Sequence, residues 1–194
     1  TAFHALRKGR LQAGETVAVF GAGGLGMSAI QLARALGALR VFAVDLDAGR
    51  LAMAERLGGE PVNAAAGDVV AAIRQATNGR GIDVALDLVG IPTTLQPAIA
   101  SLAPFGRAVA VGLGDQPVPI YPYAEIINRE AEIIGCSDHL ASEIPLLTEF
   151  VRSGALDLRP VVTETIPLDA AAVNKVMDRM STYGAGGVRT VILP

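Results

Sequence analysis

The sequence predicts an α/β fold. Residues 1–138 would form a doubly wound, six-stranded parallel sheet, and residues 139–194 a short α/β tail that packs on it. Two observations lead to this fold class. Short apolar runs rich in β-branched residues alternate with stretches whose apolar residues recur at helical spacing. The short runs are also apolar at consecutive positions, so both faces of each strand would be buried between helices, as in parallel sheets.

The expected strands are separated by helices along the first part of the chain. The first run, TVAVF at 16–20, lies between Gly14 and Gly21, and the helical pattern after it ends at Gly37. The six expected strands are 16–20, 40–45, 60–63, 82–90, 107–112 and 131–136. The helices expected between them cover 25–36, 47–57 and 68–77, and another begins at Pro92. In the tail, we expect helices at 141–153 and 169–181 and strands at 161–166 and 188–193.

The composition argues against several classes of protein. The chain has a single cysteine, Cys136, which excludes an internal disulfide and favours a reducing, cytoplasmic location. Its net charge is −3 and it has no Trp, whereas a nucleic-acid partner usually requires a basic patch with stacking aromatic residues. No apolar run approaches the roughly 18 residues of a membrane span, so we expect no membrane partner. The chain opens at Thr1 on a helix-like stretch without a signal peptide, which indicates a fragment of a longer protein.

A glycine-rich stretch, VFGAGGLG, joins the first strand to the first long helix. Gly21, Gly23 and Gly26 match the G-x-G-x-x-G pattern, which combines a tight turn, close approach to a pyrophosphate and close packing of the helix on the sheet. The helix N-terminus then favours an anion. Asp45 ends the second strand, where a carboxylate can accept hydrogen bonds from an adenosine ribose. The stretch therefore predicts a dinucleotide site in a Rossmann fold; the alternative is a glycine turn without a ligand.

Asp45 also favours NAD(H) over NADP(H). Two like charges ~4 Å apart at an effective dielectric constant of ~20 repel by about 4 kcal/mol, and the 2′-phosphate of NADP would meet the Asp45 carboxylate in this way. Arg50 complicates the argument, because it could pair with that phosphate if Asp45 moved aside. Arg50 could equally be an ordinary solvated arginine on the helix surface.

Taken together in order, several motifs resemble the coenzyme-binding and C-terminal regions of the medium-chain, zinc-type alcohol dehydrogenase-like dehydrogenases and reductases. They are TAFHAL, AGETVAVFGAGGLGMSAIQLARALGA, VFAVD, IDVALDLVG, GRAVAVG, EIIGC and the closing GGVRTVIL. The resemblance covers essentially all of the chain. It implies the coenzyme-binding part of an NAD-dependent enzyme that transfers hydride between nicotinamide and an alcohol or carbonyl compound.

The resemblance also implies a set of cofactor contacts. For the pyrophosphate and adenosine half of the cofactor, they are Gly21, Gly23, Gly24, Leu25, Gly26, Asp45 and Arg50. Leu88 and Val89 would line the ribose side of the cleft, and the backbone at Val111, Leu113, Cys136 and Asp138 would surround the nicotinamide carboxamide. Leu25 would also lie against the nicotinamide, and Thr1 matches a threonine near it. Arg189 matches an arginine that reaches back to the pyrophosphate; the alternative for Arg189 is a surface ion pair.

The N-terminal catalytic domain of the resembled family has no counterpart in this sequence. We therefore expect no catalytic residue and no metal site here, and zinc, if used, only in that domain. Cys136 and His139 form one C-x-x-H pair, whereas a catalytic zinc needs three protein ligands. The fragment alone would then be inactive. Two other functions remain open: a stand-alone nucleotide-binding module without turnover, and a methyltransferase that uses S-adenosylmethionine, which the glycine spacing disfavours.

The last strand of the expected sheet predicts a homodimer. AEIIGC at 131–136 is too apolar for a bare edge, and unpaired N–H and C=O groups invite another strand. A two-fold axis would let the edge near 115–136 pair with itself, as the resemblance also implies. Pro117, Pro119 and Pro122 limit how much of the preceding segment can pair. The alternative is a monomer whose edge is covered by the 116–123 segment folding back.

Overall fold

The computed structural model describes residues 1–181 and 187–194, and the chain divides into two compact units, Thr1–Leu156 and Asp157–Pro194. The predicted tail, 139–194, therefore spans the end of the first unit and the whole of the second. The boundary at residue 138 between a cofactor-binding domain and a tail stays a prediction.

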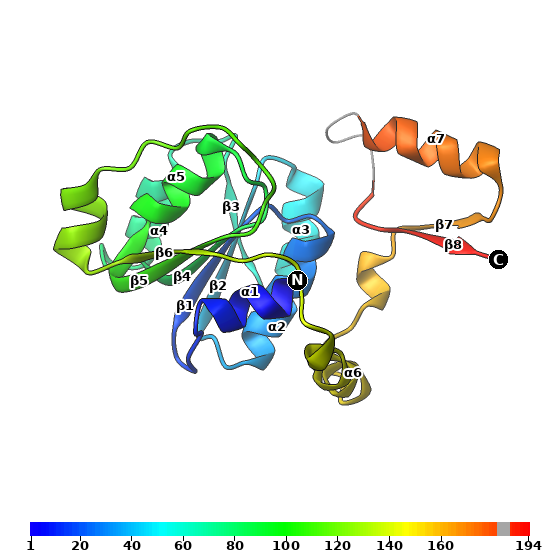
Figure 1. The fold of residues 1–194 in the computed structure, drawn as a ribbon, viewed down its shortest axis with the longest axis horizontal. Helices are drawn as coiled ribbons and strands as arrows, with labels where there is room; N and C mark the ends of the chain where they lie inside the picture. The colour runs from blue at the N-terminus through cyan, green and yellow to red at the C-terminus, as the bar shows by residue number, and fades with distance from the viewer. Residues whose placement is uncertain (182–186) are drawn as a thin grey trace. The chain divides into compact units, whose positions relative to one another are not determined.

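The first unit contains a six-stranded sheet in the order β3-β2-β1-β4-β5-β6 (Figure 1), and every neighbouring pair is parallel. The strands are β1 (Thr16–Phe20), β2 (Arg40–Asp45), β3 (Glu60–Asn63), β4 (Ile82–Asp87), β5 (Leu102–Ala110) and β6 (Glu132–Gly135). The strand order reverses between β1 and β4, where open α/β sheets bind their ligands. The predicted doubly wound parallel sheet is confirmed.

Helices cover both faces of this sheet because right-handed crossovers place them on opposite sides as the strand order runs in two directions. The helices are α1 (Ala2–Lys8), α2 (Gly24–Ala35), α3 (Ala48–Arg56), α4 (Val69–Ala76) and α5 (Pro92–Ala100). On one face α2 contacts α1 and α3, and on the other α4 contacts α5. Beneath α4 and α5 lies a fully buried core that includes Phe20, Ile73, Ile82, Ile99 and Leu102.

The carboxyl ends of five strands lie level with one another, and this alignment positions the site. Phe20 at the end of β1 is in register with Val44 of β2 and with Asp87 of β4. Asp87 is in register with Ala110 of β5, which is in register with Gly135 of β6. The turns that follow these residues therefore meet along one edge of the sheet.

Two neighbouring strands differ from the sequence prediction. The strand expected at 82–90 ends at Asp87, and the strand expected at 107–112 is β5, Leu102–Ala110, which extends back across a bulge that shifts the register between Ile82 and Val84. At this bulge Phe105 has φ +61°, in the left-handed region. The segment before β6 ends in short helical turns, η1 (Pro122–Ile126) and η2 (Ile127–Arg129).

Helix α6 (Ile144–Arg152) belongs to the first unit, and its Phe150 contacts Phe3 of α1. The rings of Phe3 and Phe150 meet edge to face with centroids 5.8 Å apart. Next to them the buried Glu143 places one carboxylate oxygen 3.0 Å from Nδ1 of His4. These contacts join residues more than 130 positions apart, so the helical periodicity alone could not reveal them.

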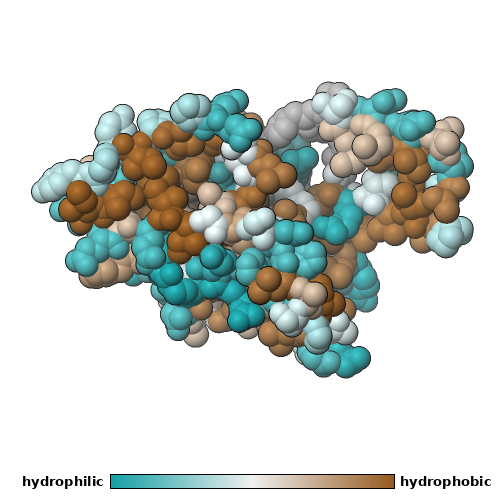
Figure 2. Space-filling view, viewed as in Figure 1, coloured by the Kyte–Doolittle hydropathy of each residue, from teal (hydrophilic) through white to brown (hydrophobic). Residues whose placement is uncertain are grey.

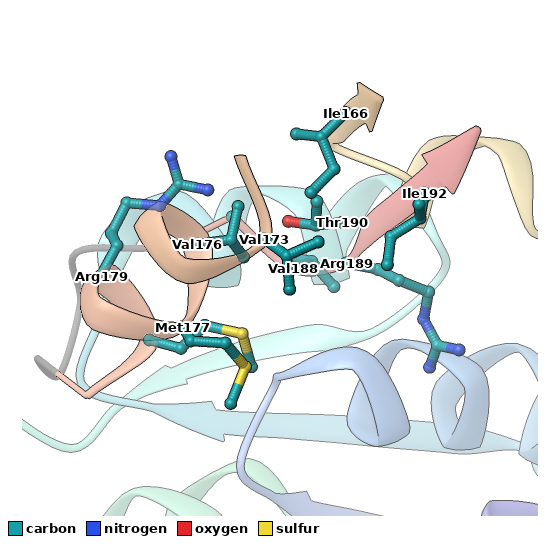
Figure 3. Close-up of a pocket in the computed structure, with 11 residues that line it drawn as sticks. Ile166, Val173, Val176, Met177, Arg179, Val188, Arg189, Thr190 and Ile192 are labelled. Carbon is teal, nitrogen blue, oxygen red and sulfur yellow. The ribbon is translucent and has the colours of Figure 1, made fainter. Parts of the chain in front are cut away.

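The second unit consists of two parallel strands, β7 (Glu164–Pro167) and β8 (Thr190–Leu193), joined through α7 (Ala170–Met180). The last strand, expected at 188–193, begins at Thr190. An apolar cavity of about 380 Å³ lies between helix and strands (Figure 3), with Val173 and Val176 on α7 and Ile192 on β8 among its lining.

Candidate dinucleotide-binding site

The three glycines of the turn after β1 are needed for different physical reasons. Gly21 has φ +96°, and a Cβ there would lie 2.7 Å from a methyl carbon of Val89. A Cβ on Gly26 would lie 2.1 Å from the carbonyl oxygen of Gly21, so α2 can begin this close to the turn only with glycine. Gly23 has φ −80°, which any residue can adopt, and its Cβ would meet nothing within 4 Å. Packing within the fold explains why positions 21 and 26 are glycine, whereas a side chain at position 23 would extend into open space.

Helix α2 begins beside that open space, since Gly23 is its N-cap. Helices leave their first-turn N–H groups without intrahelical partners, and a side-chain oxygen commonly caps them. Such caps exist on α3, where Asp47 accepts from Arg50 N–H, and on α4, where Asp68 accepts from Val70 N–H and Ala71 N–H. The N-cap of α2 is Gly23, which has no side chain to do this. The partial positive charge of this helix end is available to an anion.

Asp45 lies at the end of β2, where the sequence placed it, and is 7% exposed. Its Oδ2 accepts a hydrogen bond of 2.8 Å from Ala22 N–H in the glycine turn, and its Oδ1 accepts one of 2.9 Å from Asp47 N–H. One carboxylate oxygen therefore holds the glycine turn after β1, and the other holds the residue at which α3 begins.

Arg50 on α3 lies beside this carboxylate. Its Nη1 is 3.9 Å from Asp45 Oδ2, and its side chain is 22% exposed. The structure thus brings together the two residues that the sequence placed beside the adenosine ribose. Whether Arg50 pairs with a 2′-phosphate or is an ordinary surface arginine stays a prediction.

The contacts predicted on the ribose side of the cleft and around the nicotinamide lie in the turns after three neighbouring strands. Leu88 and Val89 follow β4, Val111 and Leu113 follow β5, and Cys136 follows β6. Leu113 is 99% exposed, while Cys136 is buried. Burial raises the pKa of the Cys136 thiol, so this side chain stays neutral at physiological pH.

Asp138, two residues beyond Cys136, has φ +52° and an exposed carboxylate. Its Oδ1 lies 2.7 Å from Nδ1 of His139 and accepts a hydrogen bond of 3.0 Å from the Thr1 hydroxyl. These two contacts, that of His139 first, lower the pKa of Asp138. Thr1 and Asp138, both predicted to lie near the nicotinamide, are thus in contact, although they are 137 positions apart in the sequence.

Arg189 lies in the second unit, immediately before β8, with its side chain exposed. Its carbonyl accepts from Thr163 N–H at 2.9 Å, which aligns β7 with β8. Figure 3 shows its side chain extending away from the valines of the cavity. The approach of Arg189 to the pyrophosphate stays a prediction.

Sequence reasoning did not single out Asp87, Gly90, Gly112 or Gly114, which shape the turns after β4 and β5. Gly90 has φ +84°, and a Cβ on Gly112 would lie 2.2 Å from Gly90 N. One signal was available in the sequence, because Asp87 is an acidic residue at the end of an otherwise almost wholly apolar strand. The close approach of Gly112 to Gly90 has no signal in the local sequence, because it arises only when β4 and β5 lie side by side.

Within residues 1–181 and 187–194, no group of three His, Cys, Asp or Glu side chains could hold a metal ion. Over the same residues, we find no helix with the length and apolar character needed to cross a membrane.

The family model described as zinc-binding dehydrogenase matches residues 24–153. The sorbitol dehydrogenase of Bacillus subtilis (strain 168) is 35% identical over 194 residues, covering 98% of this chain and 54% of that protein. The solved alcohol dehydrogenase TADH from Thermus sp. ATN1 is similar with a TM-score of 0.88 and 31% identity, over 99% of this chain and 55% of that one.

A second similar solved structure has a bound cofactor. It is a putative zinc-binding dehydrogenase from Sinorhizobium meliloti 1021 bound to NADP, with a TM-score of 0.88 and 28% identity, over 100% of this chain and 56% of that one. The chain thus spans about half the length of the relatives it matches.

Proposed function

The chain belongs to the zinc-binding dehydrogenase family, and we propose that it is the dinucleotide-binding portion of an oxidoreductase that transfers hydride between a nicotinamide cofactor and an alcohol or carbonyl compound. Family membership implies binding of NAD or NADP. The relatives that it resembles include sorbitol and alcohol dehydrogenases, which supports an alcohol or polyol as the substrate class.

One observation carries the proposal. The N-terminus of α2 has no side-chain cap, opens at Gly23 onto free space and lies at the reversal of strand order, beside the carboxylate of Asp45. Backbone N–H groups at such a helix end suit a pyrophosphate, and a carboxylate at the end of the next strand suits a ribose. A turn that needed no ligand would require Gly21 and Gly26 but not Gly23.

In this function the residues of the chain bind and orient the cofactor. The N–H groups of Gly24 and Leu25 would hold the pyrophosphate, and Asp45 the adenosine ribose. The turns after β4, β5 and β6 would hold the nicotinamide, which supplies the hydride chemistry when bound. The donor set in the described residues does not fit a zinc ion, so no step is assigned to one. We expect any zinc ligands in the part of the protein that the relatives carry beyond this chain.

Of the two cofactors that the family uses, NAD(H) and NADP(H), we propose that this chain prefers NAD(H). Asp45 is buried and linked to the glycine turn through Ala22 N–H, so it cannot move away from a 2′-phosphate without loosening that turn. Arg50 is the group that could offset this, and the S. meliloti structure bound to NADP shows that the fold accommodates that cofactor.

A homodimer through the β6 edge and a cytoplasmic location complete the proposal. Beside β6 the chain exposes large apolar side chains, including Tyr121, Tyr123, Ile127 and Ile133, which are 64%, 72%, 65% and 39% exposed. Figure 2 shows apolar surface over the region of η1 and η2. Pairing of this edge with a second copy would cover them. Light scattering of the wild type and of Ile133→Pro checks this: we expect a dimer that the variant disrupts, and a monomeric wild type would contradict it.

The function is tested by calorimetric titration of the chain with NADH, NADPH and S-adenosylmethionine. We expect binding of NADH, weaker binding of NADPH and none of S-adenosylmethionine. Binding of S-adenosylmethionine instead of NADH would replace the dehydrogenase assignment with a methyltransferase one, and tighter binding of NADPH would reverse the cofactor preference.

A further inference from the structure

Asp87 is fully buried at the carboxyl end of β4, next to the reversal of strand order. Among the residues that the structure describes, the donors to its side chain are all peptide N–H groups. Oδ1 accepts from Val89 N–H at 3.1 Å and from Gly90 N–H at 3.2 Å, and Oδ2 is 3.3 Å from Gly90 N. The carboxylate therefore fixes the turn that follows its own strand.

The main chain of the same residue fixes a second turn. The carbonyl oxygen of Asp87 accepts from Val111 N–H at 2.9 Å and from Gly112 N–H at 3.0 Å, both in the turn after β5. Four peptide N–H groups from two turns thus converge on one residue. The two turns carry four of the predicted cofactor contacts: Leu88 and Val89 on the ribose side of the cleft, and Val111 and Leu113 at the nicotinamide.

The two turns also touch backbone to backbone, without side chains between them. A Cβ on Gly114 would lie 1.8 Å from the carbonyl oxygen of Gly90, and one on Gly112 would lie 2.2 Å from Gly90 N. With so little space between the two backbones, a displacement of the 88–90 turn displaces the 111–114 turn as well.

We infer that Asp87 is the positioning residue for the nicotinamide end of the site. Its buried carboxylate sets the 88–90 turn, and its carbonyl and the glycine contacts carry that position to the 111–114 turn. This inference rests on the proposed dinucleotide site. It separates the site into two halves: Asp45 and the glycine turn of β1 form the adenosine half, and the Asp87 turns form the nicotinamide half.

Asp83 provides a matched control on the same strand. It is a buried aspartate four positions earlier, at the opposite end of β4, and it accepts from Arg80 and from Thr16 N–H at 2.8 Å. Both aspartates contribute to stability, but only Asp87 contacts the turns of the proposed site. A purely structural role would make the two substitutions equivalent for ligand binding.

The experiment is calorimetric titration of the 194-residue chain with NADH and with ADP, which lacks the nicotinamide half. For Asp87→Asn we expect an affinity for NADH about tenfold lower, since one buried acceptor is lost, and an affinity for ADP within about twofold of the wild type. Asp83→Asn should change neither affinity by more than about twofold. Gly114→Ala acts only at the contact between the turns, in an exposed loop, and should give the same split as Asp87→Asn if the latter does not fold.

Equal losses of NADH and ADP affinity in Asp87→Asn, or unchanged NADH affinity in both Asp87→Asn and Gly114→Ala, would overturn the inference. A wild type that binds neither nucleotide would refute the proposed function itself, and this result is distinct because it appears before any substitution.

Discussion

The amino ends and the carboxyl ends of the parallel strands, called here the amino edge and the carboxyl edge of the sheet, differ in the main partners of their charged groups. Near the amino edge, charges pair with charges: Arg107, 8% exposed, donates to both carboxylate oxygens of Glu15 at 2.9 and 2.8 Å, and Arg80 donates to Asp83. At the carboxyl edge, Asp45 and Asp87 accept from backbone N–H groups of the turns. At the amino edge, arginine and carboxylate side chains pair with one another. At the carboxyl edge, carboxylates fix the turns, and the N-terminus of α2 has no side-chain cap and is available to a ligand.

The largest expected effect comes from opening the amino edge. Arg107 also donates to the carbonyls of Gly9 and Arg10, so Arg107→Met removes one guanidinium from three acceptors at once. Of the hydrogen bonds that the structure describes, the Glu15 carboxylate and the Arg10 carbonyl would keep only those from Gln12. We expect a loss of about 3 kcal/mol in the free energy of unfolding, measured in urea, and NADH affinity within about twofold of the wild type.

The control for Arg107→Met is Arg10→Met, because the Arg10–Glu132 pair is exposed on both sides. Exposed pairs of this kind contribute at most about 1 kcal/mol. A tenfold loss of NADH affinity in Arg107→Met would mean that the two edges are not independent.

At the carboxyl edge, a change at Gly23 should separate binding from folding. Gly23→Ala fits the backbone and clashes with nothing, so the free energy of unfolding should change by less than about 1 kcal/mol. Its methyl group would occupy the space proposed for the pyrophosphate, so NADH and ADP should both bind at least about tenfold more weakly.

The matched variant is Gly26→Ala, whose Cβ would lie 2.1 Å from the carbonyl of Gly21. It should destabilise the fold in thermal or urea unfolding, which Gly23→Ala does not. Unchanged nucleotide affinity in Gly23→Ala would remove the main support for the proposed site.

Strain at the amino edge should be removable without loss of function. Phe105 has φ +61° and is 65% exposed, so it bears the cost of a left-handed conformation and buries little surface in return. Phe105→Gly should raise the free energy of unfolding by about 1 kcal/mol and leave NADH affinity unchanged. A decrease in stability would show instead that the Phe105 ring packs against a partner.

The smallest effect is a pH dependence at Asp83. Burial raises the pKa of this carboxyl, but hydrogen bonds from Arg80 and Thr16 N–H outweigh it, so the pKa lies below its ordinary value of 3.8. A lowered folded-state pKa stabilises the fold above the unfolded-state pKa, and this contribution is lost as the pH falls through the folded-state pKa. The stability difference between wild type and Asp83→Asn should therefore be full at pH 7 and shrink below about pH 4, measured by urea unfolding. A difference that does not change with pH would contradict it.

Much of the fold could be predicted because its signals are local. Each strand of the sheet is a short apolar run, and each helix between them repeats its apolar residues at its own period, so their existence and order could be inferred without contacts. The ends of elements were less well predicted: β5 extends back to Leu102 across a bulge, and a bulge depends on the partner strand. The contact between α6 and α1 depends on Phe3 and Phe150, which no local pattern connects.

The residues of the site divide in the same way, into those that the local sequence predicts and those that only tertiary contacts reveal. The sequence by itself determined the glycine turn and the position of Asp45, since both follow strands that are visible as apolar runs. The pattern also gave the three glycines different roles, and the tertiary structure supplies the physical reason, because a Cβ would meet other atoms at Gly21 and Gly26 but not at Gly23. Only the tertiary structure revealed Asp87, whose carbonyl reaches the turn after β5. Periodicity reports which face of an element is buried, whereas contacts between separate turns arise only when the strands are set side by side.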